Sequence, residues 1–233
     1  MHRTECRTLF ADPHALLGQT LQLSGWVRTA RTSGGIAFLE LADGTCFRKL
    51  QAVAEAGSAA FAPAAAMPTG AAVTAVGVLR ESPAAGQPVE LVLESLTLTG
   101  DAPADYPLQK KRHGFEYLRE IAHLRPRANA FQAVFRVRSL LSHAIHRFFG
   151  ERGFVWVHTP IITASDCEGA GEMFRVTTLP PGVTGPAGDF FGRPTSLTVS
   201  GQLEVETFCM AFSNVYTFGP TFRAENSNTP RHA

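Results

Sequence analysis

An arginine and a glutamate near the end of the chain have the spacing of a charged binding pair. Arg223 and Glu225 are two positions apart among apolar and β-prone residues, so a strand would project both side chains from one face. An arginine on a rigid strand is a preorganised clamp for a phosphate, and the neighbouring carboxylate can accept a hydrogen bond from an amino group. The spacing alone is not specific, because most such pairs are solvated surface charges.

Two further segments place polar side chains beside apolar runs. Residues 161–174 change from an apolar strand to a loop of small residues that contains Glu168. Binding groups concentrate on such loops when a rigid scaffold positions them. The segment that ends at Glu206 also contains Gln202 and Glu204, and we expect a strand there. Because side chains alternate in direction along a strand, the face of Glu204 stays open.

The sequence of residues 1–100 predicts a small β-barrel. An alanine-rich stretch at 54–66 is helix-prone, and strands are expected on either side of it. Alternating apolar residues and turn signals place these strands at 20–28, 36–41, 47–53, 71–80 and 89–98. Three strands, a short helix and two strands is the order of an OB-fold barrel. A small β-barrel of another type is the competing interpretation.

A change of composition at 100–107 indicates a linker after the barrel. This stretch contains two prolines and several small residues, and the basic run Lys-Lys-Arg-His follows at 110–113. Near RNA the basic run could contact phosphates, although runs of charge are more often solvated faces. We therefore expect a barrel domain at 1–100, a linker or hinge at 101–125, and a second domain at 126–233.

A long helix and a strand are expected at the start of the second domain. Apolar residues recur at three- and four-residue steps between Phe131 and Phe149, and Gly150 ends the pattern. Residues 154–157 are apolar on both faces, as expected for a strand that is covered on both sides, and Pro160 ends it. An ordinary buried helix and strand would have the same pattern.

The composition is that of a globular protein with one large or two ordinary domains. The chain has 233 residues, of which 45% are hydrophobic and 18% are charged. The net charge is +1, so any nucleic-acid binding must depend on local patches. No apolar run approaches the roughly 20 residues that cross a bilayer, and no apolar signal region begins the chain. We therefore expect a cytoplasmic protein without a membrane partner.

The cysteines and histidines do not have metal-ligand spacing. Four cysteines lie far apart, without a Cys-x-x-Cys pair or a matching histidine cluster. His143 and His146 are three positions apart on the expected helix, but no carboxylate lies at ligand spacing. We therefore expect both histidines to be exposed polar residues, and we expect neither a zinc site nor a disulfide scaffold.

The end of the chain resembles a known signature. Residues 222–229, Phe-Arg-Ala-Glu-Asn-Ser-Asn-Thr, resemble the second motif of class II aminoacyl-tRNA synthetases, in wording close to that of asparaginyl-tRNA synthetases. The helix, the strand and Pro160 resemble the first motif, which in that family forms the homodimer interface. The resemblance runs from about Gly25 to the last residue. It implies an α+β protein, with an N-terminal five-stranded OB-fold β-barrel followed by the incomplete N-terminal part of an antiparallel-sheet catalytic domain.

The resemblance implies an ATP site around the second motif. Arg223 would hold the α-phosphate of ATP and the carboxylate of the amino acid, and Glu225 would orient the nucleotide. These two are the expected catalytic residues. Arg231 or His232 would reach the γ-phosphate. Mg²⁺ would accompany ATP, but no metal ligand is expected within this chain.

The resemblance also assigns residues to the amino acid. Glu168 would receive its α-ammonium group, and Gln202 would contribute to its binding. Aspartyl-tRNA synthetases carry a lysine where Val205 stands and a glutamine where Glu206 stands. A carboxylate at position 206 suits the two N–H donors of a carboxamide and repels a carboxylate. Asparagine is therefore the expected substrate.

Three barrel residues, Arg28, Phe38 and Gln51, resemble the anticodon-binding positions of the aspartyl and asparaginyl enzymes. An aromatic ring on an OB-fold face can stack on an unstacked base, and a glutamine can bind the edge of a base. A core position for Phe38 is the competing interpretation.

Together these features predict an asparagine–tRNA ligase with tRNA(Asn), asparagine and ATP as partners, and a homodimer in the full-length protein. Asparaginyl-adenylate would form first, and the asparaginyl group would then move to the 3′ end of the tRNA. One alternative is an aspartyl-type enzyme, which would need a cation where Val205 stands. Another is a non-catalytic OB-fold RNA-binding remnant. Because the second motif lacks its return strand, we expect this chain to be incomplete and inactive alone.

Overall fold

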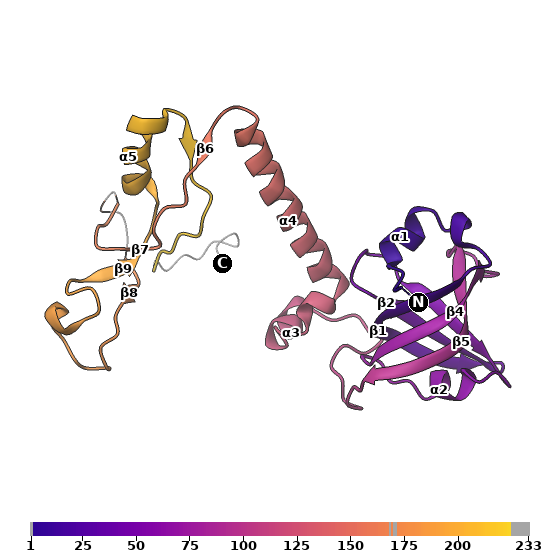
Figure 1. The fold of residues 1–233 in the computed structure, drawn as a ribbon. Helices are drawn as coiled ribbons and strands as arrows, with labels where there is room; N and C mark the ends of the chain where they lie inside the picture. The colour runs from indigo at the N-terminus through magenta and orange to yellow at the C-terminus, as the bar shows by residue number, and fades with distance from the viewer. Residues whose placement is uncertain (1, 168, 170–171, 225–233) are drawn as a thin grey trace. The chain divides into compact units, whose positions relative to one another are not determined.

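The structure is a computed structural model that describes residues 2–167, 169 and 172–224 (Figure 1). The chain divides into two compact units, Met1–Val137 and Arg138–Ala233. The first unit contains a β-barrel and the segment that follows it, and the second contains short strands and a helix. One long helix, α4, spans the boundary between the units.

The barrel is closed, with five strands in the order β1-β2-β3-β5-β4. Neighbouring strands pair antiparallel, except β3 and β5, which pair parallel. A short helix lies between β3 and β4 in the sequence, so the expected OB-fold order is confirmed. The elements are α1 Cys6–Ala11, the 3-10 turn η1 His14–Leu16, β1 Thr20–Ser33, β2 Ile36–Ala42, β3 Leu50–Glu55, α2 Phe61–Ala65, β4 Ala72–Glu81 and β5 Val89–Gly100.

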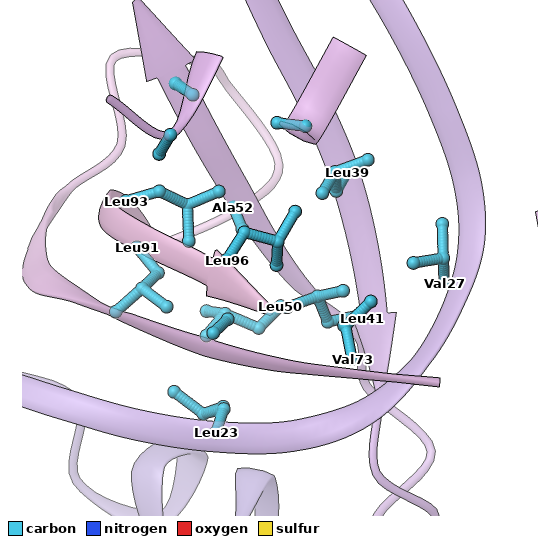
Figure 2. Close-up of a cluster of buried hydrophobic side chains, with 14 of the residues drawn as sticks. Leu23, Val27, Leu39, Leu41, Leu50, Ala52, Val73, Leu91, Leu93 and Leu96 are labelled. Atoms are coloured by element: carbon cyan, nitrogen blue, oxygen red, sulfur yellow. The ribbon is translucent and has the colours of Figure 1, made fainter. Parts of the chain in front are cut away.

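Alternation along the strands fills the barrel with aliphatic side chains. Leu21 and Leu23 of β1 are buried, and so are Leu39 and Leu41 of β2. Because side chains alternate across a strand, the residues between them face outward. The barrel therefore has an apolar core of its own. Figure 2 shows part of this core, in which the labelled side chains are Leu23, Val27, Leu39, Leu41, Leu50, Ala52, Val73, Leu91, Leu93 and Leu96.

Strand β3 begins at Leu50 and not at Phe47, because the preceding residues form a turn around Asp43. The Asp43 carboxylate accepts hydrogen bonds from the backbone N–H groups of Thr45 (3.0 Å) and Cys6 (2.8 Å). Such side-chain to backbone bonds compete with a strand ladder. Burial, together with the nearby Asp43 charge, raises the pKa of the Cys6 thiol to about 12. Cys6 is therefore a core residue and not a nucleophile.

The segment expected as a linker is packed. It contains α3 (Phe115–Glu120), and the 3-10 turn η2 (Arg125–Arg127) begins at its last residue. The Arg127 guanidinium donates to the Tyr106 hydroxyl at 3.1 Å and lies 4.9 Å from the centre of the Trp26 ring. These contacts hold the segment against the barrel. A role as a hinge stays a prediction. The buried residues Tyr106, Leu108 and Leu118 of the segment form a small cluster with Ala128, which follows η2.

Helix α4 (Asn129–Gly150) has no buried residue. β6 (Val155–Trp156) follows it and pairs parallel with β10 (Val215–Tyr216). The prediction of a strand covered on both faces is wrong for this structure, because Val155 is 40% exposed and Trp156 is 49% exposed. Exposed apolar faces of this kind mark contacts with another chain or another part of a protein. The exposed apolar residues of α4 are Val134, Phe135, Val137, Leu140, Leu141 and Phe148.

His146 of α4 is half-buried, so its expected exposure is wrong. Its Nδ1 atom lies 2.7 Å from the Tyr216 hydroxyl, and its ring packs edge-to-face against Trp156 and Phe218. The reason is that β6 and β10 bring these aromatic side chains against the helix. His143 is exposed, as expected.

The second unit also contains an antiparallel sheet with the order β7-β9-β8. Its strands are β7 Ile162–Thr163, β8 Arg175–Val176 and β9 Thr195–Leu197, and the 3-10 turn η3 (Pro186–Gly188) precedes β9. Helix α5 (Gln202–Phe212) follows β9, so the strand expected around Gln202 to Glu206 is wrong. The Ser200 hydroxyl accepts the Gln202 N–H at 3.1 Å, which satisfies one donor at the start of the helix.

The strand expected around Arg223 is also wrong over the described residues. β10 ends at Tyr216, and residues 217–224 have no assigned strand. Gly219 and Pro220 explain the break, because proline has no N–H to donate to a ladder and glycine weakens a strand interior.

Candidate catalytic and RNA-binding sites

Phe38 lies on the outer face of the barrel. It is half-buried, and its neighbours on β2, Ala37 and Leu39, are fully buried in the core. The core interpretation of Phe38 is therefore wrong. Arg31 stands opposite Phe38 on β1, and its guanidinium carbon lies 4.5 Å from the centre of the Phe38 ring. A cation over one face of the ring holds the ring in place on the barrel surface.

Gln51 shares this outer face with Phe38. It stands opposite Glu40 in the pairing of β2 with β3, and its Nε2 donates to Glu90 at 3.1 Å. Phe38, Gln51 and Arg31 line a hollow of about 160 Å³ together with Lys110 from the basic run. The structure thus brings an aromatic ring, an amide and two cations together, which are the groups that stack on bases and bind phosphates.

Arg28 does not line that hollow and stands at a β-bulge. The pairing of β1 with β2 shifts between Val27 and Thr29, and Arg28 stands at the shift. Its side chain lines two other hollows, both of which also contain Lys111. The family resemblance grouped Arg28 with Phe38 and Gln51. In the structure Arg28 does not line the hollow at Phe38, but one of the hollows that it does line shares Lys110 with that hollow. Its contact with an anticodon stays a prediction.

Arg223 is held between two segments of the second unit. The Phe222 N–H donates to the Thr198 carbonyl at 2.9 Å, and the Ala224 N–H donates to the Glu172 carbonyl at 2.8 Å. These two bonds flank Arg223 in the sequence. The backbone at Arg223 is therefore fixed although no strand includes it, and a fixed backbone is what a preorganised clamp requires.

Gln202 and Glu206 lie on one face of α5. The Gln202 Nε2 donates to the Glu206 Oε1 at 3.0 Å, because residues four apart are neighbours on a helix. Glu204 is two positions from each, so it belongs to another face of the helix. The expected strand left the direction of the Glu204 side chain undetermined. In the observed helix, Glu204 lies on a different face from the Gln202–Glu206 pair.

The buried thiol of Cys167 is a neighbour of this pair that the sequence did not single out. Its Sγ lies 3.7 Å from the Gln202 Oε1, so the thiol can donate a weak hydrogen bond to the amide oxygen. An isolated cysteine carries no sequence signal for such a contact. The loop that contains Cys167 contacts α5 only in the folded chain, because the two segments are distant in the sequence.

Several predicted residues lie outside the described part of the structure: Glu168, Glu225, Arg231 and His232. Pro160 is described and exposed. No group of three or more His, Cys, Asp or Glu residues that could hold a metal ion occurs among the described residues. No helix within the described ranges is long and apolar enough to span a membrane.

The barrel and the second unit define a class of protein. Residues 21–99 match the family of OB-fold nucleic acid binding domains, and residues 115–233 match the family described as tRNA synthetases class II (D, K and N). The second match covers 119 of the 233 residues. The chain therefore belongs to the class II tRNA synthetases of the D, K and N group.

The individual proteins to which the chain is similar include asparagine–tRNA ligases. An asparagine–tRNA ligase of Desulfitobacterium hafniense is 57% identical over 100% of this chain and 52% of its own length. One of Geobacter metallireducens is 62% identical over 93% of this chain and 49% of its own length. The crystal structure of Pyrococcus horikoshii asparaginyl-tRNA synthetase complexed with asparaginyl-adenylate is similar with a TM-score of 0.84 and 25% identity, over 100% of this chain and 50% of that one. The chain thus spans about half the length of the curated relatives it matches.

Proposed function

We propose that the protein containing this chain is an asparagine–tRNA ligase, which activates asparagine with ATP and transfers it to tRNA(Asn). The identity of 57% to a curated asparagine–tRNA ligase over the whole chain supports this proposal. The structural observation that carries it is the Gln202–Glu206 pair, because a carboxylate held in this way distinguishes a carboxamide from a carboxylate.

Glu206 is the proposed specificity residue. The Gln202 amide donates to one of its oxygens, so the carboxylate is held in one orientation. Asparagine can donate two N–H groups to such an acceptor, whereas aspartate would bring a second negative charge against it. Val205 supplies no cation that would reverse this preference. Glu168 is proposed to bind the α-ammonium group, and this assignment rests on the family resemblance alone.

Arg223 is the proposed catalytic cation. The backbone bonds on both sides of it support a clamp that holds the α-phosphate of ATP and the asparagine carboxylate together. The carboxylate would attack the α-phosphorus and pyrophosphate would leave, while the guanidinium stabilises the developing negative charge. No protein nucleophile is needed. Glu225, Arg231 and His232 are proposed for the nucleotide by resemblance.

Mg²⁺ is proposed to accompany ATP, where a divalent cation neutralises phosphate charge when it is bound. Among the residues that the structure describes, none of the acidic, histidine or cysteine side chains gather into a group that could hold a metal. No step of the proposed mechanism is assigned to the metal.

The outer face of the barrel is proposed to bind the anticodon of tRNA(Asn). Phe38 would stack on an unpaired base, and Gln51 would bind the edge of a base. Arg31 and Lys110 line the same hollow and would neutralise neighbouring phosphates. Arg28 is proposed to contact the same RNA from its position at the bulge.

We also propose a homodimer that forms through α4, β6 and Pro160. The helix has 22 residues with no buried side chain, and apolar residues are exposed along it and on β6. A second copy is the occupant we favour, because the equivalent first motif forms the dimer interface in the family that the chain resembles. Sedimentation at several concentrations tests this, with Leu140→Glu expected to leave a monomer. The proposed location of the protein is the cytoplasm.

The direct test of the proposed function uses the full-length protein that carries this chain. ATP–pyrophosphate exchange should depend on asparagine, and aspartate should support it poorly. Transfer of labelled asparagine should occur to tRNA(Asn) and not to tRNA(Asp). A preference for aspartate would support the aspartyl-type alternative. Binding of tRNA without any amino-acid-dependent exchange would support a non-catalytic RNA-binding protein.

A further inference from the structure

A basic pocket lies in the first unit, beside the barrel. It encloses about 360 Å³. Arg28 reaches it from β1, Lys111 and Arg112 come from the basic run, and Asn129 and Ala130 come from the start of α4. No Asp or Glu is found among the described residues that line it. The pocket therefore concentrates positive charge in a protein whose net charge is only +1.

Arg28 has a buried hydrogen-bond donor that is unsatisfied in the part of the chain that the structure describes. Its Nε atom is shielded from water and has no hydrogen-bond partner among the described residues. The ion pairs within the described part of the chain do not include Arg28. A buried N–H donor without an acceptor is unfavourable, and a phosphate bound to the same guanidinium would offset part of this cost. Arginine binds phosphate oxygens through two parallel N–H bonds, which suits this position.

The start of α4 adds a second attraction for an anion. The first hydrogen bond of the helix runs from the Gln132 N–H to the Ala128 carbonyl at 2.9 Å, so the N–H groups of Asn129 and Ala130 precede the helical ladder. Ala128 stands before the helix and has no side-chain oxygen that could cap them. The dipole of this 22-residue helix also favours negative charge at its N-terminus.

The walls of the pocket are held by contacts that leave its cations in place. The His113 ring stacks on Tyr117 with their centroids 5.4 Å apart, and its Nε2 lies 3.2 Å from the Pro107 carbonyl. Leu118 is buried beneath the pocket. The basic run is therefore attached on one side to a packed cluster, which limits the entropy that ordering it around a ligand would cost.

We propose that this pocket binds a phosphate group, with Arg28, Lys111 and the first turn of α4 as the binding groups. The phosphate belongs either to the RNA backbone, in which case the inference rests on the proposed function, or to a free phosphate compound. In both cases Arg28 contacts a phosphate and not a base. This distinguishes it from Phe38 and Gln51, whose contacts depend on the base.

The first experiment uses inorganic phosphate and the 233-residue chain. Phosphate should cause saturable shifts in the amide NMR signals of Asn129 and Ala130. Arg28→Gln and, separately, Lys111→Gln should weaken this binding at least about tenfold. Arg119→Gln is the matched control, because Arg119 is an exposed arginine of α3 that does not line the pocket. Lys111 is exposed, so its variant keeps the test valid if Arg28→Gln disturbs the fold.

The second experiment measures affinity for tRNA(Asn), and for the same tRNA with a changed anticodon, as a function of salt. Arg28→Gln should reduce the slope of log affinity against log salt by about 0.7–0.9, and equally for both RNAs. A reduced slope identifies the RNA backbone as the phosphate source, and phosphate binding with an unchanged slope identifies a free compound. If neither RNA binds at all, the proposed function is wrong, and the experiment with inorganic phosphate still tests whether the pocket binds phosphate. The inference is overturned if both experiments show no effect in folded variants, or if the effect of Arg28→Gln depends on the anticodon.

Discussion

The barrel and the second unit differ in how much of their apolar surface they bury. The barrel packs its leucines, valines and alanines into one cluster that includes several fully buried side chains. In the second unit, the described buried residues are few, and large apolar residues such as Phe190 and Met210 are exposed. The difference shows that the barrel has the contacts of an independent domain, whereas the second unit presents surfaces that a partner or further chain would cover.

The largest effect is expected from a comparison of this chain with a longer protein that carries it, because the chain spans about half the length of its curated relatives. The 233-residue chain alone should show no asparagine-dependent ATP–pyrophosphate exchange, whereas a protein of the length of the curated relatives that carries this chain should show it. The reason is that exchange needs a preorganised site, and the second unit leaves the large apolar residues of α5 exposed. Activity of the chain alone above background would contradict this part of the comparison.

A matched pair of truncations compares the stability of the two units. Leu39→Ala should lower the free energy of unfolding of the barrel by about 2–5 kcal/mol, because Leu39 is fully buried. Met210→Ala should change that of the second unit by less than about 0.5 kcal/mol, since Met210 is 87% exposed. The chain has one tryptophan in each unit, Trp26 and Trp156. Urea unfolding of variants that keep only one tryptophan therefore reports the stability of each unit separately. Equal changes in the free energy of unfolding would contradict the difference between the units.

Asp43→Asn should remove an acid-sensitive part of the stability of the barrel. Burial opposes the ionisation of Asp43, but hydrogen bonds from Cys6 and Thr45 lower its pKa below the ordinary value. The stabilisation is therefore complete above the unfolded carboxyl pKa of about 3.9 and is lost as the pH falls through the lower folded-state pKa. At neutral pH the variant should be about 1–3 kcal/mol less stable.

The measurement for Asp43 is urea unfolding at neutral pH and at about pH 3, below the unfolded carboxyl pKa. The difference between the original chain and Asp43→Asn should shrink at the acidic pH. A difference of the same size at both values would show that the carboxylate charge does not contribute. Glu55→Gln is a suitable control, because Glu55 is an exposed carboxylate of β3 in the same barrel.

Phe38→Ala should weaken tRNA binding by about 1–3 kcal/mol, the contribution of one stacked base. It should leave asparagine-dependent exchange by the full-length protein nearly unchanged, because exchange does not require tRNA in the proposed mechanism. Phe38 lies outside the core, so the barrel should stay folded. Loss of barrel stability comparable to that of Leu39→Ala would show that Phe38 has a core role after all.

The barrel was predictable because its strands alternate with period two and are separated by glycine and aspartate turns. The helix at Gln202 to Glu206 was not predictable from the sequence. Leu203 and Val205 alternate with glutamates there, and this alternation is typical of a half-buried strand. Hydrogen bonds to Ser200 and Gly201 start a helix there instead. A short alternating run cannot distinguish these outcomes, because its tertiary surroundings decide between them.

The candidate sites show the same limit. The family resemblance assigned Phe38 and Gln51 to the anticodon, but the sequence left a core position for Phe38 open. The pairing of β2 with β3 places both on the outer face of the barrel. The resemblance grouped Arg28 with them, but the bulge at Arg28 turns that residue toward a different hollow. Bulges depend on the pairing of two strands and have no signature in one of them. The contact of Cys167 with Gln202 was invisible for a similar reason, because it joins two distant segments.

Glu206 is the proposed determinant of the preference for asparagine, and one substitution tests this role. In the full-length protein, the ratio of exchange rates with asparagine and aspartate should fall at least about tenfold in Glu206→Gln, because hydrogen bonds to charged groups contribute about 1.5–3 kcal/mol. Glu204→Gln is the matched control, since it changes the same chemical group on another face of α5. We expect a lower ratio for Glu206→Gln and an unchanged ratio for Glu204→Gln. An unchanged ratio in Glu206→Gln would contradict the proposed role.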